Sequence, residues 1–197
     1  MRTATLLVTC LAVSSARGGE LGILVDKQYG KSQAALAFSS QKYDAVNPGG
    51  TAFRAGMEVV DLRLASLQLN TTWHTKSSTD LAYGGNHLGT FGSQYWAVGA
   101  TVNWKLLVNF GAGVEYRSEK LSFRPAVGPG ADSTLGRPWA KVNFGFSAPL
   151  PVLSPFVLLE VAVPVRSTRD TATTSPRELT EALAPQLQVG LYGGIRF

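Results

Sequence analysis

The sequence predicts an all-β protein, an eight-stranded antiparallel up-and-down transmembrane β-barrel. Apolar and polar residues alternate over about ten residues in one segment after another, which is the pattern of a strand whose two faces meet different environments. The connections between these segments are alternately long and short, as in membrane-spanning barrels with short turns at one end and long loops at the other. A chain of 197 residues suffices for one such domain.

The clearest alternation lies in segments 95–104 and 108–117, which three residues separate. Bulky apolar residues occupy one parity of each segment, and polar residues or glycine occupy the other. This pattern predicts a β-hairpin. Ten residues tilted by about 45° also have the length needed to cross the hydrocarbon layer of a bilayer.

Glycines decide which face points outward. A secreted lipocalin-like binding protein, the alternative, would place its apolar face inside. Small residues weaken a solvated strand, whereas inside a narrow barrel they leave room for longer side chains. We therefore predict the apolar face outside and these glycines inside: Gly56, Gly99, Gly111, Gly113, Gly145, Gly190 and Gly194.

Eight strands follow from the alternation. Residues 27–50, 74–92, 125–138 and 167–183 are predicted long loops, because they are polar and rich in turn formers. Residues 34–38 could extend a strand above the membrane, and residues 177–183 could form a helical turn or two. Pro164 indicates a bulge or the outer end of its strand. The predicted strands span residues 20–26, 51–60, 65–73, 95–104, 108–117 with an extension to 123, 139–148, 156–166 and 185–197.

The N-terminus predicts export. Arg2 precedes an apolar stretch from Ala4 to Val13, and small residues follow to Ala16, as in a cleaved signal peptide. We expect residues 1–16 to be removed and residues 17–197 to form an outer-membrane β-barrel domain. Cys10 would leave with the signal; a lipoprotein reading of Cys10 is the alternative. The net charge of +5 does not indicate nucleic acid, and the loop charges indicate either solvation or contact with an anionic lipid surface.

Ionisable residues on the inward parity predict a polar plug. Burial of a bare charge costs several kcal/mol, so these groups should pair or hold water, and eight strands leave little space for a conducting pore. If Arg117 and Trp139 lie at equal height, Glu115 and Lys141 are directly opposed. The predicted lumen charge network contains Arg54, Glu58, Glu115, Arg117, Lys141, Glu160, Arg166 and Arg196.

Outward aromatic residues fall at the strand ends, where membrane proteins carry interfacial belts. Four of them share the long-loop end and two share the short-turn end. Trp139 departs from this pattern, because it falls on the inward parity. The predicted membrane aromatic belt consists of Phe53, Trp73, Trp96, Trp104, Tyr116 and Phe197.

Two histidines raise the possibility of an enzyme. His74 follows Trp73, at a level where a lipid headgroup could be reached, and His87 lies in the same predicted loop. Their spacing to Ser77, Ser78 and Asp80 matches no nucleophile–base arrangement, and two histidines alone make a weak metal site. We predict no catalytic residues, metal or cofactor; the alternative is an outer-membrane lipid-modifying enzyme that uses the second long loop.

The chain ends in Gly190-Leu191-Tyr192-Gly193-Gly194-Ile195-Arg196-Phe197. Together with the signal, the eight strands and the loop lengths, this ending resembles the small outer-membrane β-barrels of the OmpA/OmpX-like family. The resemblance implies that Phe197, Ile195 and Leu191 form the signal read by the barrel-assembly machinery, although Gly193 departs from the bulky residue expected. It further implies a Gram-negative outer membrane, contact with outer-membrane lipid and a monomer. We expect a non-enzymatic protein that presents four long extracellular loops for envelope stability, adhesion or lipid contact.

Overall fold

The computed structural model describes residues 18–30, 36–38, 41–43, 47–62, 64–105, 108–148, 150, 152–168 and 175–197. The predicted signal peptide, residues 1–16, lies outside these ranges and stays a prediction. Among the described residues no helix is long and apolar enough to cross a membrane.

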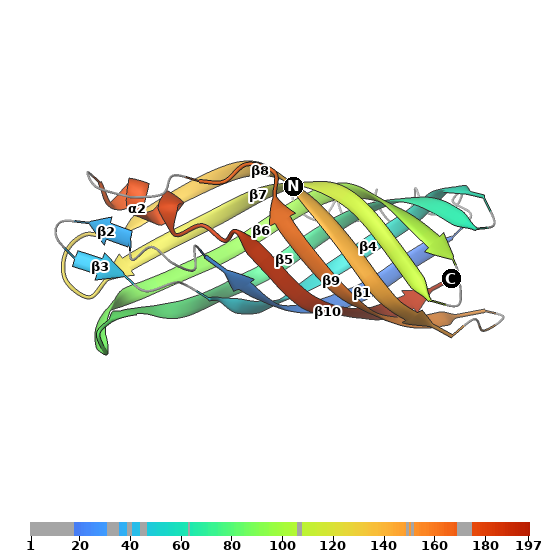
Figure 1. The fold of residues 1–197 in the computed structure, drawn as a ribbon, viewed down its shortest axis with the longest axis horizontal. Helices are drawn as coiled ribbons and strands as arrows, with labels where there is room; N and C mark the ends of the chain where they lie inside the picture. The colour runs from blue at the N-terminus through green and yellow to red at the C-terminus, as the bar shows by residue number, and fades with distance from the viewer. Residues whose placement is uncertain are drawn as a thin grey trace, which may run out of the picture.

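Eight strands close into one antiparallel barrel (Figure 1). Each strand pairs with the next in the chain, and the last strand, β10, pairs with the first, β1. The predicted fold class is confirmed. The barrel strands are β1 (Gly19–Tyr29), β4 (Gly49–Asp61), β5 (Ala65–Tyr83), β6 (Asn86–Lys105), β7 (Asn109–Pro125), β8 (Ala131–Ser147), β9 (Ser154–Pro164) and β10 (Leu187–Arg196).

Two predicted long loops are instead strand. β5 and β6 continue as one hairpin through residues 74–92 and turn at Gly84 and Gly85, whose φ values of 57° and 83° suit glycine. β7 and β8 likewise leave only residues 126–130 as a connection in place of 125–138. The loop predictions for these segments were wrong because both are mostly polar and hold turn-forming residues, which masked their alternation.

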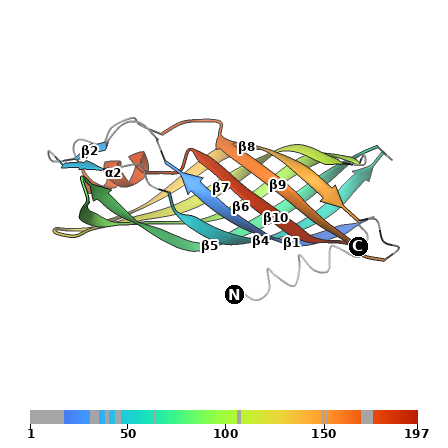
Figure 2. The ribbon, with the colours of Figure 1, turned by 60° about the horizontal axis from the view of Figure 1, so that its bottom comes forward.

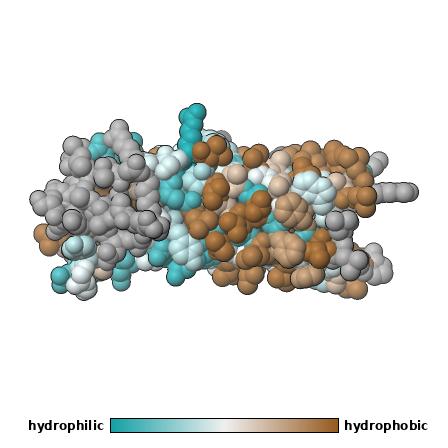
Figure 3. All heavy atoms as spheres, viewed as in Figure 1, coloured by the Kyte–Doolittle hydropathy of each residue, from teal (hydrophilic) through white to brown (hydrophobic). Residues whose placement is uncertain are grey.

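The outer wall of the barrel is apolar at its short-turn end. Leu21, Ile23 and Val25 of β1 are about half exposed, and outward residues of the other strands behave alike. Figure 3 shows this band covering the half of the molecule that holds the short turns. The apolar parity therefore faces outward there, which excludes the lipocalin-like arrangement.

The outward residues Phe53, Trp73, Trp96 and Tyr116 form a row around the barrel, which we name the aromatic row, and beyond it the inner and outer faces exchange polar and apolar character. On β7, the inward residues Leu121 and Phe123 are buried, while the outward residues Lys120 and Arg124 are exposed. Residues 75–94 of β5–β6 and 118–137 of β7–β8 form this part of the barrel, which we name the outer extension. Towards the hairpin turns its inside is mainly apolar, and its outside is polar, as in a water-soluble protein.

A short helix closes the hairpin end of the barrel. α2 (Pro176–Ala182) begins at the N-cap Ser175, whose Oγ accepts a hydrogen bond from the Glu178 N–H at 3.2 Å, and the predicted helical turn is thereby confirmed. β2 (Leu36–Phe38) and β3 (Gln41–Tyr43) form a separate two-stranded sheet, so the chain there forms strand but does not extend a barrel strand. Figure 2 shows α2 and β2 together at the end opposite the C-terminus.

Candidate functional site

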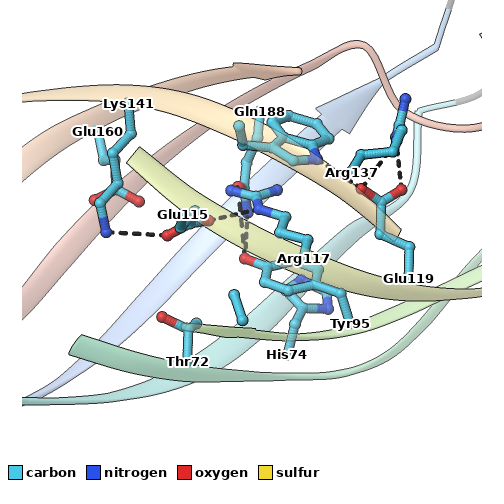
Figure 4. A network of polar contacts seen from close by, with 12 residues as sticks. Thr72, His74, Tyr95, Glu115, Arg117, Glu119, Arg137, Lys141, Glu160 and Gln188 are labelled. Carbon is cyan, nitrogen blue, oxygen red and sulfur yellow. Dashed lines mark hydrogen bonds and ion pairs between the residues drawn. The ribbon is translucent and has the colours of Figure 1, made fainter. Parts of the chain in front are cut away.

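Ion pairs cross the lumen where the outer wall is apolar. Both terminal nitrogens of the Arg54 guanidinium bond the Glu160 carboxylate, at 2.6 and 2.7 Å. Lys141 Nζ donates to Glu115 Oε2 at 3.0 Å and to Asn70 Oδ1 at 3.1 Å. All four charged side chains are almost completely buried, and each charge is compensated by a partner from another strand. Figure 4 shows the pair of Lys141 and Glu115.

The predicted strand register needs correction. Glu115 pairs with Trp139 across the β7–β8 ladder, Arg117 pairs with Arg137, and Lys141 faces Gly113. Arg117 and Trp139 therefore differ in height by two residues, because the hairpin turns at residues 126–130. A shift of two preserves the side-chain face, so Glu115 and Lys141 still form an ion pair, diagonally.

Arg117 lies between two aromatic rings. Its guanidinium carbon is 4.3 Å from the centre of the Tyr95 ring and 3.9 Å from that of Trp139. Its Nε donates to Glu115 Oε1 at 2.5 Å and its Nη2 donates to Gln188 Oε1. The planar cation thus contacts two rings and is bonded to Glu115 and Gln188, an arrangement that a lysine cannot reproduce.

A second group of charges lies nearer the hairpin end. Arg137 Nη2 donates to Glu119 Oε2 at 2.6 Å and to the Pro185 carbonyl at 2.8 Å, and Trp139 Nε1 donates to Glu119 Oε1 at 2.6 Å. Trp139 is completely buried. Trp139 therefore lies in the lumen, as its inward parity indicates, where the indole packs on Arg117 and donates a hydrogen bond to Glu119.

His74 is also inside the barrel. It is fully buried, stacks on Tyr95 with ring centroids 4.7 Å apart, and places Nε2 3.2 Å from Asp26 Oδ1. Gln188 Nε2 donates to Asp26 Oδ2 and links this pair to Arg117. The hypothesis that His74 reaches a lipid headgroup from a loop is wrong, because β5 continues past it and turns its ring into the lumen; His87 is exposed beside the hairpin turn.

Glycines leave the room that these side chains occupy. A Cβ at Gly99 would lie 2.6 Å from Glu115 Cβ, and one at Gly111 would lie 2.5 Å from Asn143 Oδ1. Any larger residue at these two positions would force the polar groups apart. The inward glycines are therefore part of the packing of the lumen.

The remaining predicted network residues lie apart from the centre. Arg196 Nε donates to Glu20 Oε2 at 2.7 Å near the C-terminus, with about a quarter of its side chain exposed, and Glu58 is half-buried towards the short-turn end of β4. Arg166 is exposed, so its prediction as a lumen charge was wrong. β9 ends at Pro164, which lacks an N–H for the ladder, and the alternation no longer describes the chain beyond it.

Beyond the charges, towards the hairpin end, lies an apolar core. The side chains come from β5, β6, β7 and the segment of α2, and the buried face of the helix lies among them. This core consists of Leu81, Phe91, Leu121, Phe123, Leu179, Ala182, Leu183 and Ala184.

Polar groups and the apolar core together line the inside of the barrel. The ion pairs and hydrogen bonds described above involve five acids and five bases, so their formal charges cancel. The acids are Glu20, Asp26, Glu115, Glu119 and Glu160, and the bases are Arg54, Arg117, Arg137, Lys141 and Arg196. Such a balanced lumen offers no excess of one charge to select an ion.

Sequence reasoning missed several lumen residues. Asp26 and His74 each fall on the inward parity at the end of a predicted strand, while Glu119 and Arg137 continue the parity of Arg117 and Trp139. Extending each alternation by a few residues into the polar segments would have found them. Gln28, Tyr95 and Gln188 were hidden because uncharged side chains were not sought.

The predicted belt residues all point outward, with 38 to 53% of each residue exposed. Phe53 and Trp73 stack at 5.8 Å, and Trp73 pairs with Trp96. Eight residues separate Trp96 from Trp104 along β6, a height of roughly 20 Å for a tilted strand. Their role as a membrane belt, and that of the outward residues Leu191, Ile195 and Phe197 as an assembly signal, stay predictions.

A closed up-and-down barrel of eight strands, with an apolar outer wall and buried polar side chains inside, defines the fold of a small transmembrane β-barrel. No family model matches the sequence, and no curated protein is significantly similar to it.

Solved structures share the fold. Ail, the attachment invasion locus protein of Yersinia pestis, is 13% identical with a TM-score of 0.52 and covers 91% of this chain and 98% of its own. Neisserial surface protein A is 11% identical with a TM-score of 0.51 and covers 91% and 95%. The predicted resemblance to small outer-membrane barrels is therefore confirmed for the fold.

Proposed function

We propose that this chain is a non-enzymatic integral outer-membrane protein whose barrel is a rigid support rather than a channel. The observation that supports this most strongly is the set of side chains inside the barrel, where bonded charges, aromatic rings and an apolar core follow one another from Glu160 to Leu183. A packed lumen gives stability and a fixed shape, and it provides no path for solutes.

The outer extension supplies the working surface. Because its faces are those of a water-soluble protein, it stands in water beyond the membrane and is held by its own core. This geometry supports a role in adhesion, envelope stability or lipid contact, with export and insertion through the barrel-assembly machinery. Two continuous hairpins present that surface, so its shape is more rigid than four free loops would provide.

Fractionation and gel mobility test the placement. The full-length protein, expressed in a Gram-negative host, should be recovered with the outer membrane and should migrate differently on a detergent gel when unheated than when boiled. Release into the soluble fraction without a mobility difference would contradict the proposal.

Conductance and lipid analysis test the absence of transport and catalysis. The purified barrel should leave the conductance of a planar bilayer at its baseline, and stable single-channel steps would contradict a closed lumen.

The double variant His74→Ala/His87→Ala should leave the envelope lipid profile unchanged by mass spectrometry relative to wild type. A lipid species lost only in that variant would favour the lipid-modifying enzyme.

A further inference from the structure

A groove of about 290 Å³ lies in the wall of the outer extension, across β5 to β8. Its cations are Lys76 of β5 and Lys120 and Arg124 of β7, all exposed. Gln94, Ser122 and Thr134 add neutral hydrogen-bonding groups. The groove therefore combines several cations with uncharged donors, which is the composition of an oxyanion site.

Gly92 forms part of the hollow. It shares the outward parity of Gln94 and Trp96, and a Cβ there would lie 2.5 Å from Ser122 Oγ and 3.5 Å from Lys76 Cε. A side chain at this position would occupy space between Lys76 and Ser122. The groove thus depends on a missing side chain as well as on the charges around it.

The charges in the groove are only partly compensated. Arg124 pairs with Asp132, Nη2 to Oδ1 at 2.8 Å, and both side chains are more than half exposed. Within the described chain, Lys76 and Lys120 form no ion pair. Three bases and one acid (3 − 1) leave a formal charge of +2 in the groove, and the two lysines carry it.

The groove lies next to the aromatic row. Gln94 is two residues beyond Trp96 on β6 and pairs with Lys120 of β7, so the lysine is displaced from the row by about 7 Å along the strand. If the aromatic row marks the edge of the hydrocarbon layer, as proposed above, the two lysines stand at the level of the lipid headgroups. A phosphate attached to a membrane lipid would meet them there, whereas a soluble anion would have to approach along the membrane surface.

We propose that this groove binds a phosphate on the headgroup of an outer-leaflet glycolipid, with Lys76 and Lys120 as its charged ligands and Gln94, Ser122 and Thr134 as neutral partners. The inference rests on the proposed outer-membrane placement. It gives the general expectation of lipid contact a defined position on the barrel wall, on one side of the molecule only.

The test uses the full chain folded into phosphatidylcholine nanodiscs that contain a few per cent of diphosphoryl lipid A or of lipid A with both phosphates removed. Native mass spectrometry measures the fraction of barrels that retain one lipid A molecule. Wild type should retain the diphosphoryl form preferentially. Lys76→Ala and Lys120→Ala should each weaken retention about fivefold, since a cation near an anionic surface is worth that much.

Two further variants separate the groove from general attraction to the membrane. Gly92→Val should weaken retention without changing any charge, because it fills the hollow. Lys27→Ala is the matched control. Lys27 is exposed on β1, two outward positions beyond Ile23, and Ile23 pairs with the belt residue Phe53. Removing the Lys27 side chain should leave lipid A retention unchanged.

The outcomes are distinct. Equal retention of both lipid A forms, or an equal loss in Lys27→Ala and Lys120→Ala, would overturn the proposal. Binding of a soluble sulfated oligosaccharide that Lys76→Ala abolishes, with lipid A retention unaffected, would assign the groove to a soluble polyanion and would also overturn it. The detergent-gel mobility of each sample reports separately whether the barrel has formed, so a failure of the proposed placement is recognised as such.

Discussion

Arg54 of β4 and Glu160 of β9 join two strands that are not neighbours in the barrel, through two hydrogen bonds of 2.6 and 2.7 Å. Two buried charges fixed in this way resist local opening, because separating them leaves both charges uncompensated in a buried site. The pair therefore braces the barrel across its lumen.

Removing one partner should destabilise the barrel strongly. We expect Glu160→Ala to lower the free energy of unfolding by about 3 to 5 kcal/mol, since Arg54 keeps a buried charge. The double variant Arg54→Leu/Glu160→Leu should recover most of that loss. Guanidinium unfolding in detergent micelles, followed by gel mobility, measures both, and a double variant less stable than the single would contradict this explanation.

Arg117 should not tolerate replacement by lysine. Arg117→Lys keeps the charge but loses stacking between Tyr95 and Trp139 and the fixed geometry at Glu115 and Gln188, so unfolding should require about 1 to 3 kcal/mol less. Arg124→Lys, at an exposed ion pair, is the control, with an expected change within about 0.5 kcal/mol. Similar losses of unfolding free energy in the two variants would show that the contacts of Arg117 with Tyr95 and Trp139 do not stabilise the barrel beyond an ordinary ion pair.

A lysine scan along β8 tests the boundary between membrane and water. Val142→Lys places a cation on the apolar outward band and should cost about 2 to 4 kcal/mol in lipid. Thr134→Lys, eight residues away on the same face of the outer extension, should cost almost nothing. Folding yields in phosphatidylcholine vesicles and unfolding midpoints compare the two; equal costs would mean that the outward band does not meet lipid.

Leu179 should hold the hairpin end together. It is fully buried in the core around α2, so Leu179→Ala should destabilise that end by about 2 to 5 kcal/mol. Hydrogen exchange should then rise in residues 75–94 and 118–137 and stay slow near Glu115 and Arg54. Arg177→Ala, on the exposed side of the same helix, should leave exchange unchanged, and faster exchange throughout the barrel would indicate a single cooperative unit instead.

The strand positions inside the membrane band could be predicted because each residue there has only two possible environments. Val98 and Val142 needed to be outward and Glu115 inward, and a period of two expresses this directly. The polar segments 74–92 and 125–138 could not be assigned in this way. Within the first of them Leu81 and Phe91 point inward, where apolar residues had been expected to point outward. The sense of the alternation changes when the solvent outside changes.

For the candidate site, too, the sequence predicted which face a residue occupies but not which residues meet. Parity alone places Arg54, Glu115, Arg117, Lys141 and Glu160 on the inward face. Parity says nothing about height, so the offset between Glu115 and Lys141 was wrong by two residues. Arg166 was assigned inward because nothing in the alternation marks where a strand ends.

By itself the sequence determined the fold class, the number of barrel strands and the outward direction of the apolar face, because alternation and glycine placement are local properties. Only the tertiary structure decided which charges meet, that His74 and Trp139 belong to the lumen, and that α2 closes the hairpin end. Those contacts depend on the register and stagger of strands that close on each other across the barrel, and bonds such as that between Arg54 and Glu160 join residues 106 positions apart in the chain.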